Sequence, residues 1–164
     1  MTTVAMGRTQ NGGPISEPTE SAAPVASSFE DLRAAWLAVW PEAMEIWSRF
    51  TRLREPIWCW TPREEKDQGL TDSFAMIRLT DHLVVISLRQ VQQQKLEAFG
   101  REVLAHEIGH HMMCPANLTD HGRLIARIRL GLPKIEHLAP MVANLYADLL
   151  INHHLQKEAG LNIA

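Results

Sequence analysis

Two histidines four residues apart flank a glutamate in the segment His106-Glu107-Ile108-Gly109-His110. Residues four apart share one face of a helix, so both imidazoles can be offered to one cation. Zinc accepts such nitrogen ligands, and a catalytic zinc site has three protein ligands and one open position. Glu107 would project beside the metal, where it can take a proton from water as general base. The spacing therefore predicts a zinc site.

A second polar pattern lies downstream in an otherwise apolar segment. Asn144, Asp148 and Asn152 recur at four-residue intervals, so they form a polar stripe along one side of a predicted helix. A carboxylate buried there needs a partner, and a cation provides one. We expect Asp148 to be the third metal ligand. Asn144 and Asn152, one turn away on either side, are expected to hydrogen-bond the ligand carboxylate or an imidazole.

Several alternatives stay open for the ligand set. Asp148 can instead form a structural salt bridge with Arg123, Arg127 or Arg129. His111 is predicted to point about 100° away from His110 around the helix. His121 and Tyr146 are weak candidates for substrate-side groups that stabilise an oxyanion. The other rival ligands are His137, His153, His154 and Cys114, and we expect His153 and His154 to be solvated.

One helix is predicted to precede the strands. Ser28 is a suitable N-cap, and Phe29, Leu32 and Trp36 recur behind it at helical spacing. Pro41 is expected to break or restart this helix, because proline removes a backbone donor. The tryptophans of the segment are interpreted as core residues.

Three short β-prone runs follow, at 57–60, 74–79 and 83–88. The last two flank Thr80-Asp81 and are predicted to form a hairpin. The charged, glycine-containing stretch at 61–71 is expected to be a loop. The strand at 83–88 is expected to pair with an extended substrate by strand addition.

Helices are predicted for the rest of the chain. Apolar residues follow helical spacing from 92 through the histidine motif, and Pro115 is expected to end that helix. Asp120 is expected to cap a short amphipathic helix. A final helix at 140–157 has Gly160 as its stop signal. The order of helix, strands and helices indicates an α+β fold with a small β-sheet, an active-site helix and a C-terminal ligand-bearing helix.

Bulk composition narrows the class of protein. The 164 residues suggest one domain at 28–164, preceded by a Gly-, Pro- and Ser-rich tail at 1–27 that we expect to be disordered. The net charge of −3 argues against nucleic-acid binding. We expect no membrane span and no secretory signal. The two cysteines, Cys59 and Cys114, are therefore interpreted as reduced thiols of a cytoplasmic protein.

The two motifs together resemble a known family. HEIGHH followed by Asn144, Ala147-Asp148 and Ile151-Asn152 is similar to the bacterial putative metallopeptidase domain, a zincin, that precedes a von Willebrand factor A-like domain. The resemblance covers about residues 70–156. A weaker one, through residues 143–147, is to the ImmA/IrrE regulators, which carry a glutamate ligand where Met141 and Val142 stand here. The chain ends at Ala164, and we expect no von Willebrand-like domain in it.

The resemblance implies a zincin-like fold and zinc-dependent hydrolysis of a peptide or protein substrate. It also implies a MoxR-type ATPase or a von Willebrand factor A-like protein as partner. The alternative hypothesis is a non-catalytic zincin-like module that acts as adaptor in a larger, ATPase-associated assembly. A third, a DNA-directed regulator, is disfavoured by the acidic net charge.

Overall fold

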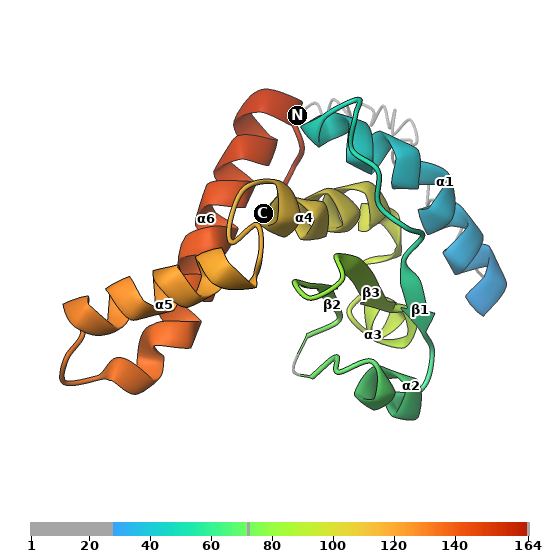
Figure 1. The fold of residues 1–164 in the computed structure, drawn as a ribbon. Helices are drawn as coiled ribbons and strands as arrows, with labels where there is room; N and C mark the ends of the chain where they lie inside the picture. Colours follow the sequence, from blue (N-terminus) through green and yellow to red (C-terminus); the bar gives the residue numbers. More distant parts are fainter. Residues whose placement is uncertain (1–27, 72, 164) are drawn as a thin grey trace, which may run out of the picture.

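The fold combines helices with a small sheet, as Figure 1 shows for a computed structural model that describes residues 28–71 and 73–163. Helix α4 (Gly100–Met112) lies above the sheet, and α1 (Phe29–Trp47) and α6 (Ala139–Ala159) pack against it. The predicted α+β class is confirmed. The predicted tail at 1–27 lies outside the described residues.

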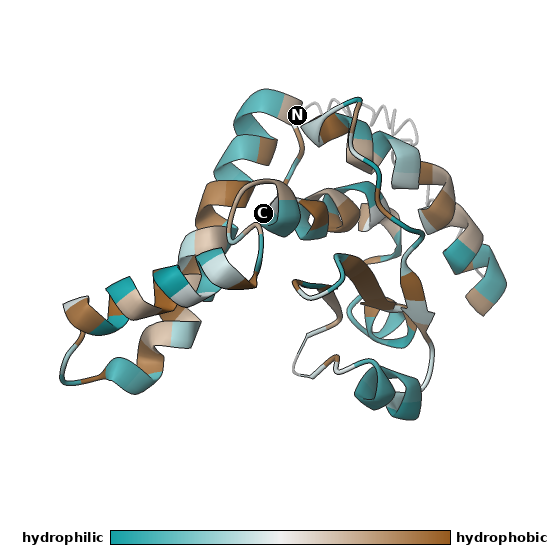
Figure 2. Ribbon diagram, viewed as in Figure 1, coloured by the Kyte–Doolittle hydropathy of each residue, from teal (hydrophilic) through white to brown (hydrophobic). Residues whose placement is uncertain are grey.

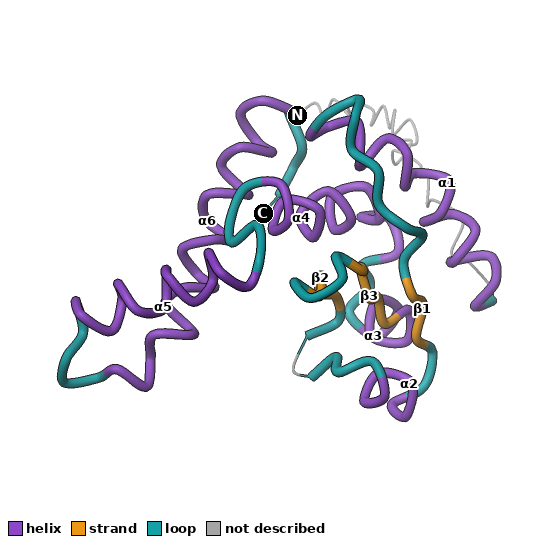
Figure 3. Tube along the Cα trace, in the orientation of Figure 1, coloured by secondary structure: helices purple, strands orange, loops and turns teal. Residues whose placement is uncertain are grey.

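The remaining elements are short, and Figure 3 shows how they connect the main helices. In chain order they are β1 (Ile57–Cys59), α2 (Pro62–Asp67), β2 (Ala75–Arg78), β3 (Leu83–Ser87), α3 (Leu88–Gln93), η1 (Glu97–Phe99), α5 (Leu118–Gly131) and η2 (Glu136–Leu138).

The three strands have the order β1-β3-β2. The predicted hairpin is confirmed: β2 and β3 are antiparallel, with Ile77 opposite Val84, and a turn joins them. His82 closes this turn with a φ of 55°. β1 pairs with β3 in parallel. Because β3 is flanked on both sides, the expectation that the strand at 83–88 pairs with a substrate is wrong.

Among the described residues, one long edge of β2 pairs with no strand and faces the α4 side; we call it the free edge of β2. The carbonyls of Phe74 and Arg78 accept from Ser87 N (2.7 Å) and His82 N (2.8 Å). Backbone groups of alternate residues point to opposite edges of a strand. The N–H and C=O groups of Ala75 and Ile77 therefore point away from β3. This edge, rather than β3, is available to another strand.

The core lies between α1, the sheet, α4 and α6, and the hydropathy colouring of Figure 2 shows apolar residues on the strands and on α4. Trp36, Val84, Ile86, Leu104 and Ile151 are buried there. Trp36 Nε1 donates to the Glu97 carbonyl (3.0 Å), so its one polar group is satisfied. The interpretation of the α1 tryptophans as core residues holds for Trp36 and Trp40, which are 1% and 5% exposed.

Pro41 does not break the first helix. α1 runs without interruption from Phe29 to Trp47, with Ser28 as the predicted N-cap, and contains Pro41. Pro41 itself is exposed, whereas Trp40 and Ala43 beside it are buried. Packing of the buried face thus stabilises a helix that loses one backbone hydrogen bond.

The stretch predicted as a loop at 61–71 contains a helix, α2. Thr61 and Glu64 form a capping box, and Pro62 occupies the first helical turn. This local capping stabilises six residues that carry no helical apolar pattern. The buried Glu65 then anchors α2 to α3, since Arg89 donates to both of its oxygens (3.0 and 2.7 Å).

The helix predicted from residue 92 is in fact divided. α3 ends at Gln93, Lys95 takes a left-handed φ of 58°, and α4 begins only at Gly100. The apolar residues Leu96 and Phe99 therefore do not belong to the motif helix. α4 ends at Met112, before Pro115, as predicted.

The helix that follows is capped by a different residue from the one predicted. Asn117, not Asp120, is the N-cap of α5, and its side chain accepts from Asp120 N (3.0 Å). Asp120 occupies the first turn and accepts from the Asn117 amide (2.9 Å). Only Asn117 caps a backbone N–H, and the Asp120 carboxylate holds the Asn117 side-chain amide in place. The final helix ends at Gly160 in the left-handed conformation, as predicted.

Candidate metal centre

Helices α4 and α6 cross at close range where the two polar motifs meet. Gly109, inside the histidine motif, permits this contact. A Cβ at that position would lie 2.6 Å from Ile151 Cγ2 and 2.6 Å from Trp47 Cζ2. The absence of a side chain at Gly109 therefore lets α6 approach the face of α4 that carries the histidines.

His106, His110 and Asp148 converge at this crossing. Their potential ligand atoms all lie within 4.8 Å of one another. Asp148 Oδ1 lies 3.5 Å from His106 Nε2 and 3.4 Å from His110 Nε2. Ligands about 2.0–2.1 Å from a tetrahedral zinc ion are separated by about 3.3–3.4 Å. The separations of Asp148 Oδ1 from the two Nε2 atoms fit the edges of such a tetrahedron.

Each imidazole is oriented through its other nitrogen. His106 Nδ1 lies 2.7 Å from Asn152 Oδ1, and His110 Nδ1 lies 3.0 Å from the Cys114 carbonyl. Both partners are acceptors, so each Nδ1 carries the proton and donates it. The Nε2 lone pairs are then left for a cation.

Asp148 is held from its second oxygen. Asn144 Nδ2 donates to Asp148 Oδ2 (2.9 Å), which leaves Oδ1 directed at the imidazoles. The alternative salt bridge is absent among the described residues: Asp148 pairs only with the two histidines, and Arg123 pairs with Asp120 (3.3 Å).

The electrostatics of the cluster follow from its burial. Burial by itself would raise the pKa of Asp148, but the two neighbouring imidazoles hold that pKa well below its usual range. For His106, burial favours the neutral form, but Asp148 and the nearby Glu107 charge produce a net rise in pKa. The carboxylate thus remains ionised and attracts positive charge to the space between the three side chains.

Glu107 lies beside the ligands as a buried carboxyl. It is 8% exposed, and burial raises its pKa. The Ile77 backbone N–H on the free edge of β2 donates to this carboxyl. Glu107 is therefore fixed between the ligand cluster and the strand edge.

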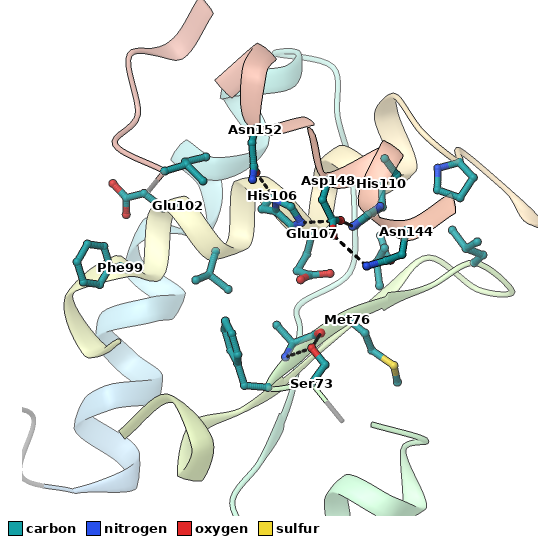
Figure 4. A pocket seen from close by; sticks show the side chains of 18 of the residues that line it. Ser73, Met76, Phe99, Glu102, His106, Glu107, His110, Asn144, Asp148 and Asn152 are labelled. Carbon is teal, nitrogen blue, oxygen red and sulfur yellow. Dashed lines mark hydrogen bonds and ion pairs between the residues drawn. The ribbon is translucent and has the colours of Figure 1, made fainter. Parts of the chain in front are cut away.

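All these groups open into one pocket of about 730 Å³, shown in Figure 4. Ligands and asparagines line its α4–α6 wall, and β2 lines the opposite wall. The lining side chains are mainly apolar around this polar centre. Those from outside the two motifs are Ser73, Phe74, Ala75, Met76, Ile77, Leu79, Leu96, Phe99, Glu102, Val103, Pro115, His121, Ala143, Ala147, Asn162 and Ile163.

Of the two predicted substrate-side groups, the structure brings only one to the pocket. His121 lines it. Tyr146 does not, and its side chain is 49% exposed on α6. Two residues along a helix correspond to about 200° of rotation, so Tyr146 faces away from Asp148.

The rival ligands do not join the cluster. His111 faces His82 at a ring-centroid distance of 4.1 Å, and Cys114 contributes its carbonyl rather than its thiol. His137 and His153 are exposed. His154 is not solvated as expected: it is partly buried and stacks on Trp47 at 4.7 Å.

Sequence reasoning missed several pocket residues. Ile77 contributes through its backbone on the free edge of β2, and Ser73 contributes a hydroxyl that bonds to the Ala75 backbone on that edge, neither of which residue types reveal. Phe99 was assigned to the motif helix instead of the pocket wall. Glu102 could have been predicted from the sequence, since it stands four residues before His106 and thus on the same helix face.

Comparison with family models, with curated proteins and with solved structures finds no match to this chain. Among the described residues, no helix is long and apolar enough to cross a bilayer.

Proposed function

We propose that this chain is a zinc-dependent peptide hydrolase with a zincin-like fold, whose metal ligands are His106, His110 and Asp148. The observation that carries the proposal is the common approach of three ligand atoms from two helices, with a buried carboxyl, Glu107, beside them. Structural zinc sites use four protein ligands, whereas catalytic sites use three and keep one position open. Three ligands facing a pocket fit the catalytic class.

The donor set favours zinc among divalent cations. Two imidazole nitrogens and one carboxylate oxygen suit zinc, whereas calcium and magnesium are bound mainly by oxygen. A zinc ion held there would supply Lewis acidity, which activates water and polarises a carbonyl group.

Glu107 is the proposed general base. Its position between the ligands and β2 puts its carboxyl within the space that a water and a peptide carbonyl would share. It would accept the proton of the attacking water and deliver it to the leaving amine. His121, which also lines the pocket, is retained as a candidate for stabilising charge on the carbonyl oxygen.

The free edge of β2 is the proposed binding site for the peptide backbone. Ile77 and Ala75 direct backbone groups there, and strand addition uses such groups. The Ile77 N–H already donates to Glu107, so the groups that a peptide would use are the Ile77 carbonyl and the N–H and carbonyl of Ala75. Ser73 Oγ now donates to the Ala75 carbonyl (2.6 Å) and accepts from the Ala75 N–H (3.3 Å). A peptide that pairs along this edge would replace the Ser73 hydroxyl at both positions.

The proposal is tested by Glu107→Gln. This variant removes the base but none of the three ligands, so we expect it to retain zinc while peptide hydrolysis falls by about 10²-fold or more. Zinc content is measured by elemental analysis, and hydrolysis by mass spectrometry of a peptide library. Glu45→Gln, an exposed change on α1 outside the pocket, is the control and should behave as the unaltered protein.

The outcomes separate the two functional classes. Full activity in Glu107→Gln would show that the proposed mechanism is wrong. Bound zinc in the unaltered protein without turnover of any library peptide would favour the non-catalytic adaptor module. In that case partner binding, including to a MoxR-type ATPase or a von Willebrand factor A-like protein, becomes the function to measure.

A further inference from the structure

The pocket differs between its two ends. In Figure 4, Phe99 and Glu102 lie at one end, Asn144 lies at the other, and the ligand cluster lies between them. The Phe99 end has an apolar wall built by four segments of the chain. We call this wall the apolar recess; it consists of Phe74, Leu96, Phe99, Val103 and Ile163.

The apolar recess has unfilled apolar surface. Phe99 is 43% exposed, and the other four side chains are partly buried against the core. An apolar group placed there would remove this surface from water at about 25 cal/mol per Å². Since Phe74 precedes β2 and Val103 precedes His106 by three residues, the recess adjoins the ligand cluster directly.

The direction of β2 relates the recess to a bound peptide. The Ile77 N–H donates to Glu107, so the reacting bond lies opposite Ile77. Antiparallel pairing, the more stable arrangement per residue, makes the peptide run from the Arg78 end towards Phe74. The recess then receives the side chain that follows the cleaved bond.

The charged side chains that line the pocket determine which charged groups of a peptide can pair with it. None of the described lining residues is Lys or Arg, so a peptide's terminal carboxylate finds no cationic partner there. Glu102 has no hydrogen bond or ion pair within the described part of the chain, whereas its neighbour Arg101 pairs with Glu42 (3.7 Å). Glu102 is therefore an uncompensated carboxylate at the recess end.

We propose that the pocket binds internal peptide segments that carry a large apolar residue and, two positions later, lysine or arginine, and that Glu102 is the residue that selects the cation. Alternate residues of an extended peptide share a face, so the cation two positions after the apolar residue reaches the same side of the pocket. The inference rests on the proposed function, because that function locates the reacting bond.

The test measures binding rather than turnover. Full-length Glu107→Gln protein loaded with zinc is titrated with fluorescent, blocked peptides of sequence Gly-Ala-Ala-Phe-Ala-Lys-Ala. Matched peptides replace Phe by Ala, or Lys by Gln or Glu. At low salt we expect the Lys peptide to bind about threefold to fivefold more tightly than the Gln peptide, the range of a partly exposed ion pair.

Variants that change the charge at Glu102 test whether this residue causes the preference for the Lys peptide. In the same protein, Glu102→Gln should abolish the preference for Lys, and Glu102→Lys should reverse it in favour of the Glu peptide. Glu45→Lys, which makes the same charge change outside the pocket, should leave the preference intact. Circular dichroism confirms that each variant is folded.

Equal affinities for the Lys and Glu peptides, or a preference that survives Glu102→Lys, would overturn the inference. So would equal binding of the Phe and Ala peptides. Failure of the proposed function is distinguishable: selective binding to Glu107→Gln without cleavage by the unaltered protein supports the binding site and rejects hydrolysis. Cleavage of peptides without selective binding would support the hydrolase and reject the selective binding site.

Discussion

The ligand residues depend on their neighbours for orientation. His106 and His110 each use Nδ1 to donate to a fixed oxygen, from Asn152 and from the Cys114 backbone, respectively. Asp148 is fixed by Asn144 in the same way. These contacts select the ring tautomer that presents Nε2 to a cation. Removing one of them should weaken the metal site without removing a ligand.

Asn152→Ala tests this role. The variant removes the acceptor of the His106 Nδ1–H, so we expect zinc affinity to fall by about 10- to 100-fold. Competition with a chromophoric chelator measures the affinity. Asn162→Ala is the control, because Asn162 lines the same pocket without a hydrogen bond to a ligand. Equal zinc affinity in the Asn152 variant and the unaltered protein would show that this contact does not orient the imidazole.

At the scale of elements, the site depends on the distance between α4 and α6. Ile151 and Leu155 of α6 are fully buried in the core beside Leu104 and Ile108 of α4. Gly109 of α4 faces Ile151 of α6, and the site leaves no room for a side chain at this position. The packing that holds α6 in place is thus the same packing that brings Asp148 to the histidines.

The same substitution at two helical glycines, Gly109→Ala in α4 and Gly122→Ala in α5, tests the role of this contact. Alanine at 109 would overlap Ile151 and Trp47, so we expect it to destabilise the fold by about 1–3 kcal/mol and to weaken zinc binding. Alanine at 122 meets nothing within 4 Å and should stabilise α5 by about 0.5–1 kcal/mol. Urea denaturation measures both. A stable, zinc-binding Gly109→Ala protein would contradict the role given to this contact.

For the whole molecule, helix α4 is packed on more sides than α5. α4 lies between α1, the sheet and α6, whereas α5 has no buried residue and packs mainly on α6. Figure 1 shows α5 and the first part of α6 extending away from the sheet. A metal ion shared by α4 and α6 would therefore connect the well-packed part of the molecule to this extension.

Zinc should consequently stabilise the fold. Free zinc at 100 times the Kd adds about 2.7 kcal/mol to the free energy of unfolding. For a chain of this size, that corresponds to a rise in Tm of about 5–10 °C. Differential scanning fluorimetry with zinc and with EDTA measures the shift. Asp148→Asn should lose it, and an undiminished shift in that variant would exclude Asp148 as a ligand.

The sequence alone determined the residue types and their helical registers: His106 and His110 on one face, and Asn144, Asp148 and Asn152 on another. These follow from local periodicity, which residue spacing encodes. It also located the hairpin and the α6 stop. It misjudged Pro41, the segment of α2 and the division between α3 and α4, because capping and packing can override or create helix ends locally.

Only the tertiary structure decided which distant groups meet. It brought α6 onto α4 through Gly109, excluded the arginines from Asp148, and placed Tyr146 outside the pocket. It put β3 in the centre of the sheet, so that β2 rather than β3 has the free edge beside the site. It also brought Phe74, Phe99 and Glu102 into the pocket. Such contacts depend on helix crossing and strand order, which are set by packing across the whole core and leave no periodic trace in the sequence.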